Sequence, residues 1–217
     1  MQDAVFGDRR ADRPRLVLAS SSPRRRELLA LIGVWPAIVL SPDVDETPRP
    51  GEDPADLVRR LAGAKAEAGV DLDVVARPVS TVTIGADTVV ALDGEILGKP
   101  TDFSDARRML EALNGRSHDV FTGVAATIVE NTGEQRTESV VVRTAVDFRP
   151  LTIADIDWYL STKEWNDRAG SYAIQGAGGF LVAGLRGSYH NVVGLPLAEL
   201  DVLLSSLGHP LRSWIDD

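Results

Sequence analysis

The sequence of 217 residues contains no cysteine. That absence excludes a disulfide framework, a thiolate zinc site and a cysteine nucleophile, and nothing argues for an oxidising compartment. The polar start, Met1 to Arg15, lacks the apolar stretch that a secretory signal requires, and no later apolar run is long enough to span a membrane. We therefore expect a cytoplasmic protein without a membrane partner.

Positive charge is scarce, with 23 Lys and Arg against 32 Asp and Glu and a net charge of −9. A broad nucleic-acid-binding face needs many cations, so we expect no nucleic-acid partner, although a small anion can still bind at a local basic site. The three histidines lack metal-ligand spacing, which argues against zinc. Neither a G-x-x-x-x-G-K-[ST] loop nor a G-x-S-x-G elbow is present, so the sequence supports neither a P-loop NTPase nor that type of serine hydrolase.

The composition that remains, 44% hydrophobic and 25% charged, is typical of a globular protein. The length suits one large domain or two closely fused lobes. We expect residues 1–14 to form a loose tail and residues 15–217 to form a single two-lobed domain. The segment Gly69–Ser80 is expected to be a longer surface loop.

Hydrophobic periodicity predicts helices that alternate with hairpins. Leu16–Ala19 is a predicted buried strand, and Asp93-Gly94 is a predicted hairpin turn between Val79–Leu92 and the returning residues 95–97. This alternation favours a mixed α/β sheet over a strictly parallel one. The expected helices run from Pro23 to about Gly33 with Leu28, Leu29, Leu31 and Ile32 inward, from Pro54 with Leu57, Leu61, Ala64 and Ala68 inward, over Phe103–Leu113 with Met109, Leu110 and Leu113 inward, after Thr152 with Ile153, Ile156 and Leu160 inward, and over Leu197–Leu207; a second hairpin joins Val120–Val129 to Val140–Phe148.

Three hydroxyls and three arginines surround the start of the first predicted helix, in Ser20-Ser21-Ser22-Pro23-Arg24-Arg25-Arg26. Positive side chains in a first turn oppose the helix dipole, a conflict that a bound phosphate would resolve. The alternative is a serine N-cap followed by solvated arginines.

Asp87 stands in Thr83–Ala91, a run otherwise suited to a buried strand. A buried carboxylate needs a partner or a metal ion, so Asp87 is a functional candidate, with an Asp on the solvent face of a strand as the alternative. Lys99 follows the hairpin and is expected near Asp87 if the strands pair in simple register. Lys65, one turn after Leu61, is expected to border the apolar stripe of its helix and extend its amine past the core edge.

Two further segments offer ligands. Val44-Asp45-Glu46 and Asp87 together could supply oxygen ligands to Mg²⁺, although an acidic loop can equally be merely solvated. The glycine-rich stretch Asp167–Gly179 allows close backbone approach to a ligand, and its Gln175 offers both a donor and an acceptor to a base edge. The alternative there is a flexible loop in which Tyr172 and Ile174 only pack.

In this order, these segments resemble the Maf (septum-formation) family over Leu16 to Leu200. The resemblance rests on Leu18-Ala19-Ser20-Ser21-Ser22-Pro23-Arg24-Arg25, Val44-Asp45-Glu46, Ala64-Lys65-Ala66, Gly85-Ala86-Asp87-Thr88, Leu97-Gly98-Lys99-Pro100, Gly115-Arg116-Ser117-His118, Ala169-Gly170-Ser171-Tyr172-Ala173-Ile174-Gln175-Gly176 and Val193-Gly194-Leu195-Pro196.

The resemblance implies an elongated, two-lobed α/β fold, similar to that of inosine triphosphatases, with a cleft between the lobes and often a homodimer. It implies hydrolysis of nucleoside triphosphates to monophosphate and pyrophosphate, with Asp87 as the general base. It also implies Mg²⁺ or Mn²⁺ on Glu46 and Asp87. The residues that it implies for substrate binding are Ser20, Ser22, Arg24, Arg25, Lys65, Thr88, Lys99 and Gln175.

Within the family, Gly85-Ala86-Asp87-Thr88 with Arg24 and Gln175 resembles the branch that acts on dTTP and UTP. Two alternatives stay open at this point: a pyrophosphatase of the 7-methyl-GTP type, and a non-enzymatic nucleotide-binding regulator of septum formation.

Overall fold

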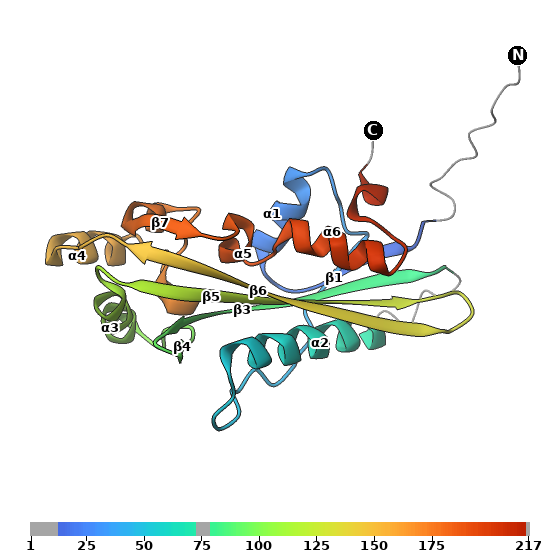
Figure 1. Ribbon diagram of the computed structural model, residues 1–217, viewed down its shortest axis with the longest axis horizontal. Helices are drawn as coiled ribbons and strands as arrows, with labels where there is room; N and C mark the ends of the chain where they lie inside the picture. Colours follow the sequence, from blue (N-terminus) through green and yellow to red (C-terminus); the bar gives the residue numbers. More distant parts are fainter. Residues whose placement is uncertain (1–12, 73–78, 216–217) are drawn as a thin grey trace, which may run out of the picture.

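The protein is an elongated α/β structure built on one seven-stranded sheet (Figure 1). A computed structural model describes residues 13–72 and 79–215. The strand order is β2-β1-β3-β5-β6-β7, with β4 paired to β3. The strands are β1 Arg15–Ala19, β2 Ile38–Leu40, β3 Thr81–Leu92, β4 Glu95–Leu97, β5 Ser117–Val129, β6 Gln135–Phe148 and β7 Val182–Arg186.

The sheet is mixed, which confirms the expectation from the alternation of helices and hairpins. β1 runs parallel to β2 and β3, whereas the pairs from β3 through β7 are antiparallel. Both predicted hairpins are present. The β3–β4 turn places Asp93 and Gly94 at φ of 53° and 86°, the backbone region that glycine and aspartate tolerate in tight hairpin turns.

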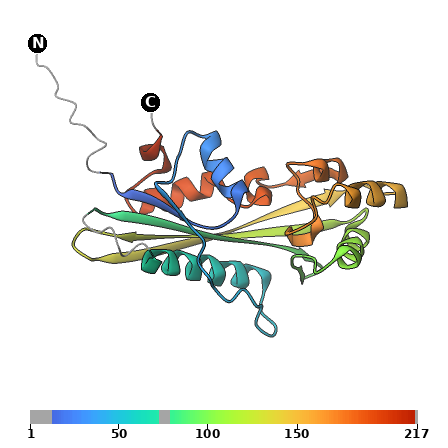
Figure 2. The same cartoon turned by 180° about the vertical axis from the view of Figure 1, so that it is seen from behind.

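Helices cover both faces of the sheet (Figures 1 and 2). α2 lies along one face and α1 and α6 lie on the other, while α3 and α4 lie near one end of the long strands. The bounds of α3 and the burial of Met109, Leu110 and Leu113 match the prediction. The helices are α1 Pro23–Leu31, α2 Pro54–Leu72, α3 Phe103–Leu113, α4 Ile153–Ser161, α5 Tyr189–Val193 and α6 Leu197–Ser206.

Two predicted core positions are wrong. Leu31 and Ile153 are each 76% exposed. Leu31 lies two residues after the buried Leu29, about 200° around the helix, so it points away from the sheet. Ile153 begins α4 one turn before Ile156, the first residue of that helix to be buried.

The inward face of α2 also differs from the prediction. Leu57 and Leu61 are buried as expected, but Ala64 and Ala68 are only half-buried. The buried stripe continues instead through Ala62, Lys65, Ala66 and Gly69. Because α2 extends to Leu72, residues 69–72 are helical rather than part of the expected surface loop, and residues 73–78 of that loop lie outside the described range.

Two glycines let α2 lie directly on the sheet. A Cβ atom at Gly85 of β3 would stand 2.3 Å from the Ala62 carbonyl oxygen, and one at Gly123 of β5 would stand 2.2 Å from the Val58 carbonyl oxygen. Both distances are far below van der Waals contact, so any side chain at these positions would push the helix away.

The buried apolar residues form two main clusters that share the long central strands. One packs Leu28 and Leu29 of α1 and Leu200 and Leu204 of α6 against β1, β3 and β5. The other joins α3 and α4 to the far ends of β5 and β6 and includes Tyr159. The molecule therefore has two apolar cores along one continuous sheet (Figure 1).

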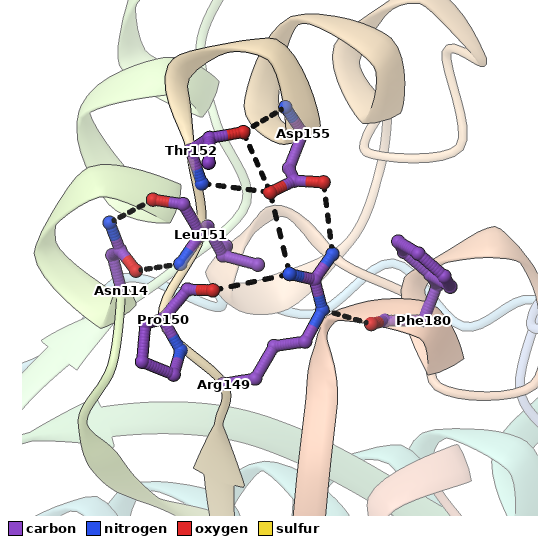
Figure 3. A network of polar contacts seen from close by, with 7 residues as sticks. All are labelled: Asn114, Arg149, Pro150, Leu151, Thr152, Asp155 and Phe180. Carbon is purple, nitrogen blue, oxygen red and sulfur yellow. Dashed lines mark hydrogen bonds and ion pairs between the residues drawn. The ribbon is translucent and has the colours of Figure 1, made fainter.

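A polar network fixes α4 to the end of β6 (Figure 3). Thr152 and Asp155 form a capping box, and Arg149 donates to Asp155 at 3.0 Å and to the Phe180 carbonyl oxygen at 2.9 Å. Asn114 bonds both backbone groups of Leu151. The bond to Phe180 anchors the 3₁₀ turn Ala177–Leu181, which begins within the glycine-rich stretch, to the end of the sheet.

Of the expected tail, residues 1–12 lie outside the described range. Its last residue, Pro14, is buried, and its carbonyl oxygen accepts a 2.9 Å hydrogen bond from Trp214 Nε1. Over the part of the chain that the structure describes, no helix has the length and apolarity needed to cross a membrane.

Candidate active site

The sheet is interrupted along one edge of β3. β1 pairs with residues Thr81–Gly85 of that strand, and β4 pairs on the same side with Val90–Leu92. Over the described residues, Ala86–Val89 thus have no strand neighbour on this side, although β5 pairs with them on the other. An interruption at the carboxyl end of a parallel strand, here β1, is where open α/β sheets bind their ligands.

A pocket of about 310 Å³ opens at this interruption. Its wall draws on the loop after β1, the segment around Glu46, α2, β3, the β4–α3 connection and the glycine-rich stretch. All ten candidate residues from the sequence line it, namely Ser20, Ser22, Arg24, Arg25, Glu46, Lys65, Asp87, Thr88, Lys99 and Gln175.

A lysine stands between the two carboxylates. The Lys65 Nζ atom lies 2.6 Å from Oδ1 of Asp87 and 2.5 Å from Oε1 of Glu46. Asp87 and Lys65 are buried, while Glu46 remains half exposed on its loop. Burial alone would raise the pKa of Glu46. The hydrogen bond and the charge of Lys65 outweigh burial and hold this pKa below its usual value.

The contact between Lys65 and Asp87 follows from the packing of α2. Gly85 precedes Asp87 by two residues, so both lie on the same face of β3, and Gly85 admits the helix backbone. Lys65 lies one turn beyond Ala62, the residue that covers Gly85. The expectation that Lys65 extends its amine past the core edge is therefore wrong, because its ammonium is buried on the carboxylates.

Arg25 is held inside the protein rather than in solvent. Its guanidinium donates to Ser20 Oγ at 2.8 Å, to the Gly194 carbonyl oxygen at 2.8 Å and to Thr88 Oγ1 at 3.2 Å. Burial lowers the pKa of Arg25, against the opposing charges of Asp87 and Glu46. Ser20, Arg25 and Thr88 therefore brace the loop after β1 against β3 and against the segment after α5.

The start of α1 agrees with an anion site better than with a simple serine cap. Ser22 is the N-cap residue, yet its side chain makes no capping hydrogen bond. Arg24 lines the pocket with a buried Nη1 atom that has no hydrogen-bond partner among the described residues. An anion would satisfy both the helix N-terminus and this guanidinium.

Lys99 reaches the pocket without contacting Asp87 directly. Its Nζ atom lies 2.8 Å from Oδ1 of Asp167, its direct partner, while Lys99 and Asp87 line the same pocket, as expected from their places in the sequence. The hydrogen bond to Asp167 raises the pKa of Lys99, and the charges of Glu46 and Asp87 act in the same direction.

The sequence reasoning missed three polar residues of this region. Asp167 and Arg168 line the pocket beside Lys99. Thr122 lies opposite Thr88 on β5, and their hydroxyls are 2.9 Å apart. The charged pair at the start of the glycine-rich stretch was the available signal for the first two. With them, five cationic side chains and three carboxylates line the pocket, an excess of positive charge in a chain of net charge −9.

The glycine-rich stretch is an ordered part of the wall. It forms the 3₁₀ turns Ala169–Ser171 and Ala177–Leu181, and Tyr172 and Ala173 are buried. Gln175 is exposed, and within residues 13–72 and 79–215 its side chain makes no hydrogen bond. The amide is thus presented at the pocket rather than used by the fold.

The donor set fits a divalent cation that also binds substrate. Two carboxylates already converge on one cation, the Lys65 ammonium, and carboxylate oxygen suits Mg²⁺ and Mn²⁺. Within the described chain no group of three or more His, Asp or Glu residues could hold a metal ion. Further ligands would have to come from phosphate and water.

A sequence model described as "Maf-like protein" matches residues 15–207. The chain belongs to the Maf family. Its relatives include proteins named dTTP/UTP pyrophosphatase from three bacteria. That of Myxococcus xanthus (strain DK1622) is 49% identical over 93% of this chain and 96% of its own length. That of Pseudoalteromonas atlantica is 52% identical over 89% of this chain and 98% of its own length. That of Anaeromyxobacter dehalogenans (strain 2CP-1) is 52% identical over 91% of this chain and 96% of its own length.

Comparison with solved structures gives more distant similarities to this Maf protein. A HAM1 protein from Coxiella burnetii shares 15% identity with a TM-score of 0.44, covering 89% of this chain and 100% of the other. A nucleoside-triphosphatase / dITP/XTP pyrophosphatase from Mycobacterium abscessus shares 19% identity with a TM-score of 0.33, covering 63% of this chain and 74% of the other.

Proposed function

We propose that this Maf protein hydrolyses dTTP and UTP to the nucleoside monophosphate and pyrophosphate. The observation that carries the proposal is the convergence of Asp87, Glu46 and Lys65 in a pocket with an excess of positive charge. Relatives that share about half of its residues over nearly the full family region are named dTTP/UTP pyrophosphatases.

Asp87 is the proposed general base. It lies on the floor of the pocket, at the interruption of the sheet. Its carboxylate would orient a water molecule and accept the proton as the water oxygen bonds to the α-phosphorus. The bond from the α-phosphorus to the bridging oxygen then breaks, and pyrophosphate leaves with the electron pair of that bond.

The basic residues stabilise the charge that moves onto the leaving group. Arg24, Lys65 and Lys99 all line the pocket, and charge stabilisation of this kind is the main contribution a protein makes to such a displacement. Ser22 adds a hydroxyl at the N-terminus of α1, where backbone N–H groups can bind phosphate.

Glu46 and Asp87 are the proposed ligands for Mg²⁺ or Mn²⁺. When bound, such an ion neutralises phosphate charge and acts as a Lewis acid. In the structure Lys65 contacts one oxygen of each carboxylate, Oε1 and Oδ1.

Gln175 is the proposed reader of the base. Its amide presents a donor and an acceptor, which suit the O4 and N3–H edge of uracil or thymine, whereas cytosine presents the reverse pattern. Gln175 belongs to the glycine-rich stretch and lines the pocket, and its side chain makes no hydrogen bond to another described residue. The proposal includes action in the cytoplasm, on free nucleotides, as a homodimer.

The test is to incubate the purified protein with dTTP, UTP, CTP, GTP and 7-methyl-GTP, each with Mg²⁺ or Mn²⁺, and to measure pyrophosphate release. We expect the highest kcat/KM for dTTP and UTP, and we expect Gln175→Ala to lower it for these two substrates selectively. A preference for 7-methyl-GTP would replace the substrate assignment. Correctly folded protein that turns over none of the triphosphates would favour a nucleotide-binding regulator.

A further inference from the structure

Arg168 combines a place in the pocket wall with an unsatisfied polar atom. The residue lines the pocket between Asp167 and the glycine-rich motif. Its Nε atom is buried and has no hydrogen-bond partner among the described residues. A buried guanidinium N–H without a partner costs stability, so a site that retains one usually has a ligand to receive it.

Among the described residues, no carboxylate forms an ion pair with Arg168. The nearest acidic neighbour in sequence, Asp167, is engaged by Lys99 at 2.8 Å. Burial lowers the pKa of Arg168, whereas for Arg25 the charges of Asp87 and Glu46 oppose the same effect of burial. The charge of Arg168 is therefore available to an anion that enters the pocket.

The backbone around Arg168 is held in a fixed position. Gly170 has a φ of +64°, and a Cβ atom there would lie 2.9 Å from Val90, so this segment packs tightly on β3. Gly170 N donates to the Gly98 carbonyl oxygen at 3.1 Å, and Ser171 N donates to the Arg168 carbonyl oxygen at 3.0 Å. These contacts tie Arg168 to the residue that precedes Lys99.

Arg24 offers a second guanidinium of the same kind. Its buried Nη1 atom also has no partner within the described chain, and it reaches the same pocket from the start of α1. Two separate segments thus each contribute to the wall of one cavity an arginine whose guanidinium has a buried, unsatisfied atom. Guanidinium groups bind phosphate oxygens through short, charge-assisted hydrogen bonds.

We propose that Arg168 binds a phosphate oxygen of the nucleoside triphosphate and is, with Arg24, one of two arginines that hold the polyphosphate from different segments. This inference rests on the proposed function. It assigns to Arg168 a role in substrate binding that the motif residues alone do not supply.

The experiment compares wild type with Arg168→Met, Arg168→Lys and the control Arg108→Met, whose arginine is exposed on α3 and pairs only with Asp105 among the described residues. Calorimetry gives the Kd of α,β-imido-dTTP, pyrophosphate and dTMP, and steady-state assays with dTTP give KM and kcat. For Arg168→Met we expect the analogue to bind about 10-fold to 100-fold more weakly, as for loss of a charged hydrogen bond. KM should rise by a similar factor with kcat less affected, Arg168→Lys should recover part of the loss, and Arg108→Met should match wild type.

Analogue affinity and KM within twofold of wild type in folded Arg168→Met would overturn the inference. Comparison of pyrophosphate with dTMP then shows which phosphate Arg168 contacts. If Arg168→Met does not fold, Arg168→Lys carries the test, because it keeps the charge but loses the Nε donor, and an unchanged Kd for the analogue would again overturn the inference. A wild-type protein that binds the analogue without turning over dTTP would refute the proposed hydrolysis and leave the role of Arg168 in binding measurable.

Discussion

The ammonium of Lys65 donates a 2.6 Å hydrogen bond to Oδ1 of Asp87, across the contact between α2 and β3. The same ammonium lies 2.5 Å from Glu46. Two acidic groups that would repel each other are thus held together by a cation that belongs to the protein. An entering metal ion has to share these oxygens with Lys65 or displace it.

Replacement of Lys65 by Met should therefore strengthen metal binding in the absence of nucleotide. We expect Lys65→Met to bind Mn²⁺ about tenfold more tightly than wild type, because the competing ammonium is gone. Without metal the variant should be less stable by about 3 kcal/mol, since two carboxylates lose a buried partner. Titration of Mn²⁺ by electron paramagnetic resonance, with thermal unfolding at each concentration, measures both effects.

Glu46→Gln is the matched control for that experiment, because it removes a carboxylate instead of the cation. Its Mn²⁺ affinity should fall, and hydrolysis should need more metal. If Lys65→Met lowers Mn²⁺ affinity, as Glu46→Gln should, the ammonium does not compete with the metal.

Asp87→Asn should abolish hydrolysis while it preserves the fold. The substitution removes charge and basicity with little change in shape, so kcat should fall by at least about 10²-fold, in the range typical of a lost general base. Binding of α,β-imido-dTTP should persist. Turnover close to wild type in this variant is incompatible with the role assigned to Asp87.

Gly85→Ala should damage both the fold and the site. A Cβ atom 2.3 Å from the Ala62 carbonyl oxygen forces α2 away from β3, which we expect to lower the free energy of unfolding by about 1–3 kcal/mol. Lys65 should move with the helix, so kcat should fall as well. Gly63→Ala is the control, because a Cβ atom at this helical position meets nothing within 4 Å and should stabilise the protein slightly. Equal unfolding midpoints for the two variants would contradict this packing.

The buried pair of His118 and Tyr172 predicts a pH dependence of stability. His118 Nε2 lies 2.9 Å from the Tyr172 hydroxyl, and burial lowers the pKa of His118 from 6.5 to about 4, against the charges of Asp119 and Asp147. Between pH 4 and 6.5 the unfolded chain binds more protons than the folded one. The stability that neutral His118 provides is complete above pH 6.5 and is lost as the pH falls toward 4.

Thermal unfolding over this pH range measures the effect, whose slope for one group reaches at most about 1.4 kcal/mol per pH unit. His118→Gln should flatten the curve, because glutamine can still bond the hydroxyl but does not titrate. A curve for His118→Gln parallel to that of wild type would assign the pH dependence to other groups.

Much of the fold follows from local sequence signals. Both ends of the helix Phe103–Leu113 were predicted correctly. Asp102 is its N-cap residue, and the apolar stripe read from the sequence is the face of the helix that is buried. The mixed sheet followed from the Asp93-Gly94 turn between two strand patterns. Leu31 and Ile153 were predicted to point inward but are exposed, because periodicity shows that a residue is apolar and leaves open whether the sheet lies beneath it.

For the site, the sequence indicated which residues line the pocket but not how they pair. By itself Lys65 is typical of a surface lysine in sequence, but it is buried because Gly85 of β3 and Gly123 of β5 let α2 lie directly on the sheet. Arg25 resembled its neighbours Arg24 and Arg26, although it alone bonds to Gly194, 169 residues away. Contacts between distant segments depend on tertiary structure, and no local pattern encodes them.

The bond from Arg25 to Gly194 also bears on when the pocket is completed during synthesis of the chain. Translation proceeds from the N-terminus, so the loop after β1 emerges long before its partner Gly194, which lies 169 residues after Arg25. Until Gly194 has left the ribosome, Arg25 lacks that acceptor and the loop after β1 lacks its brace. A nascent chain that already carries Asp87, Lys65 and Glu46 therefore still lacks a braced loop after β1, and the wall of the pocket is completed only when the segment after α5 joins the fold.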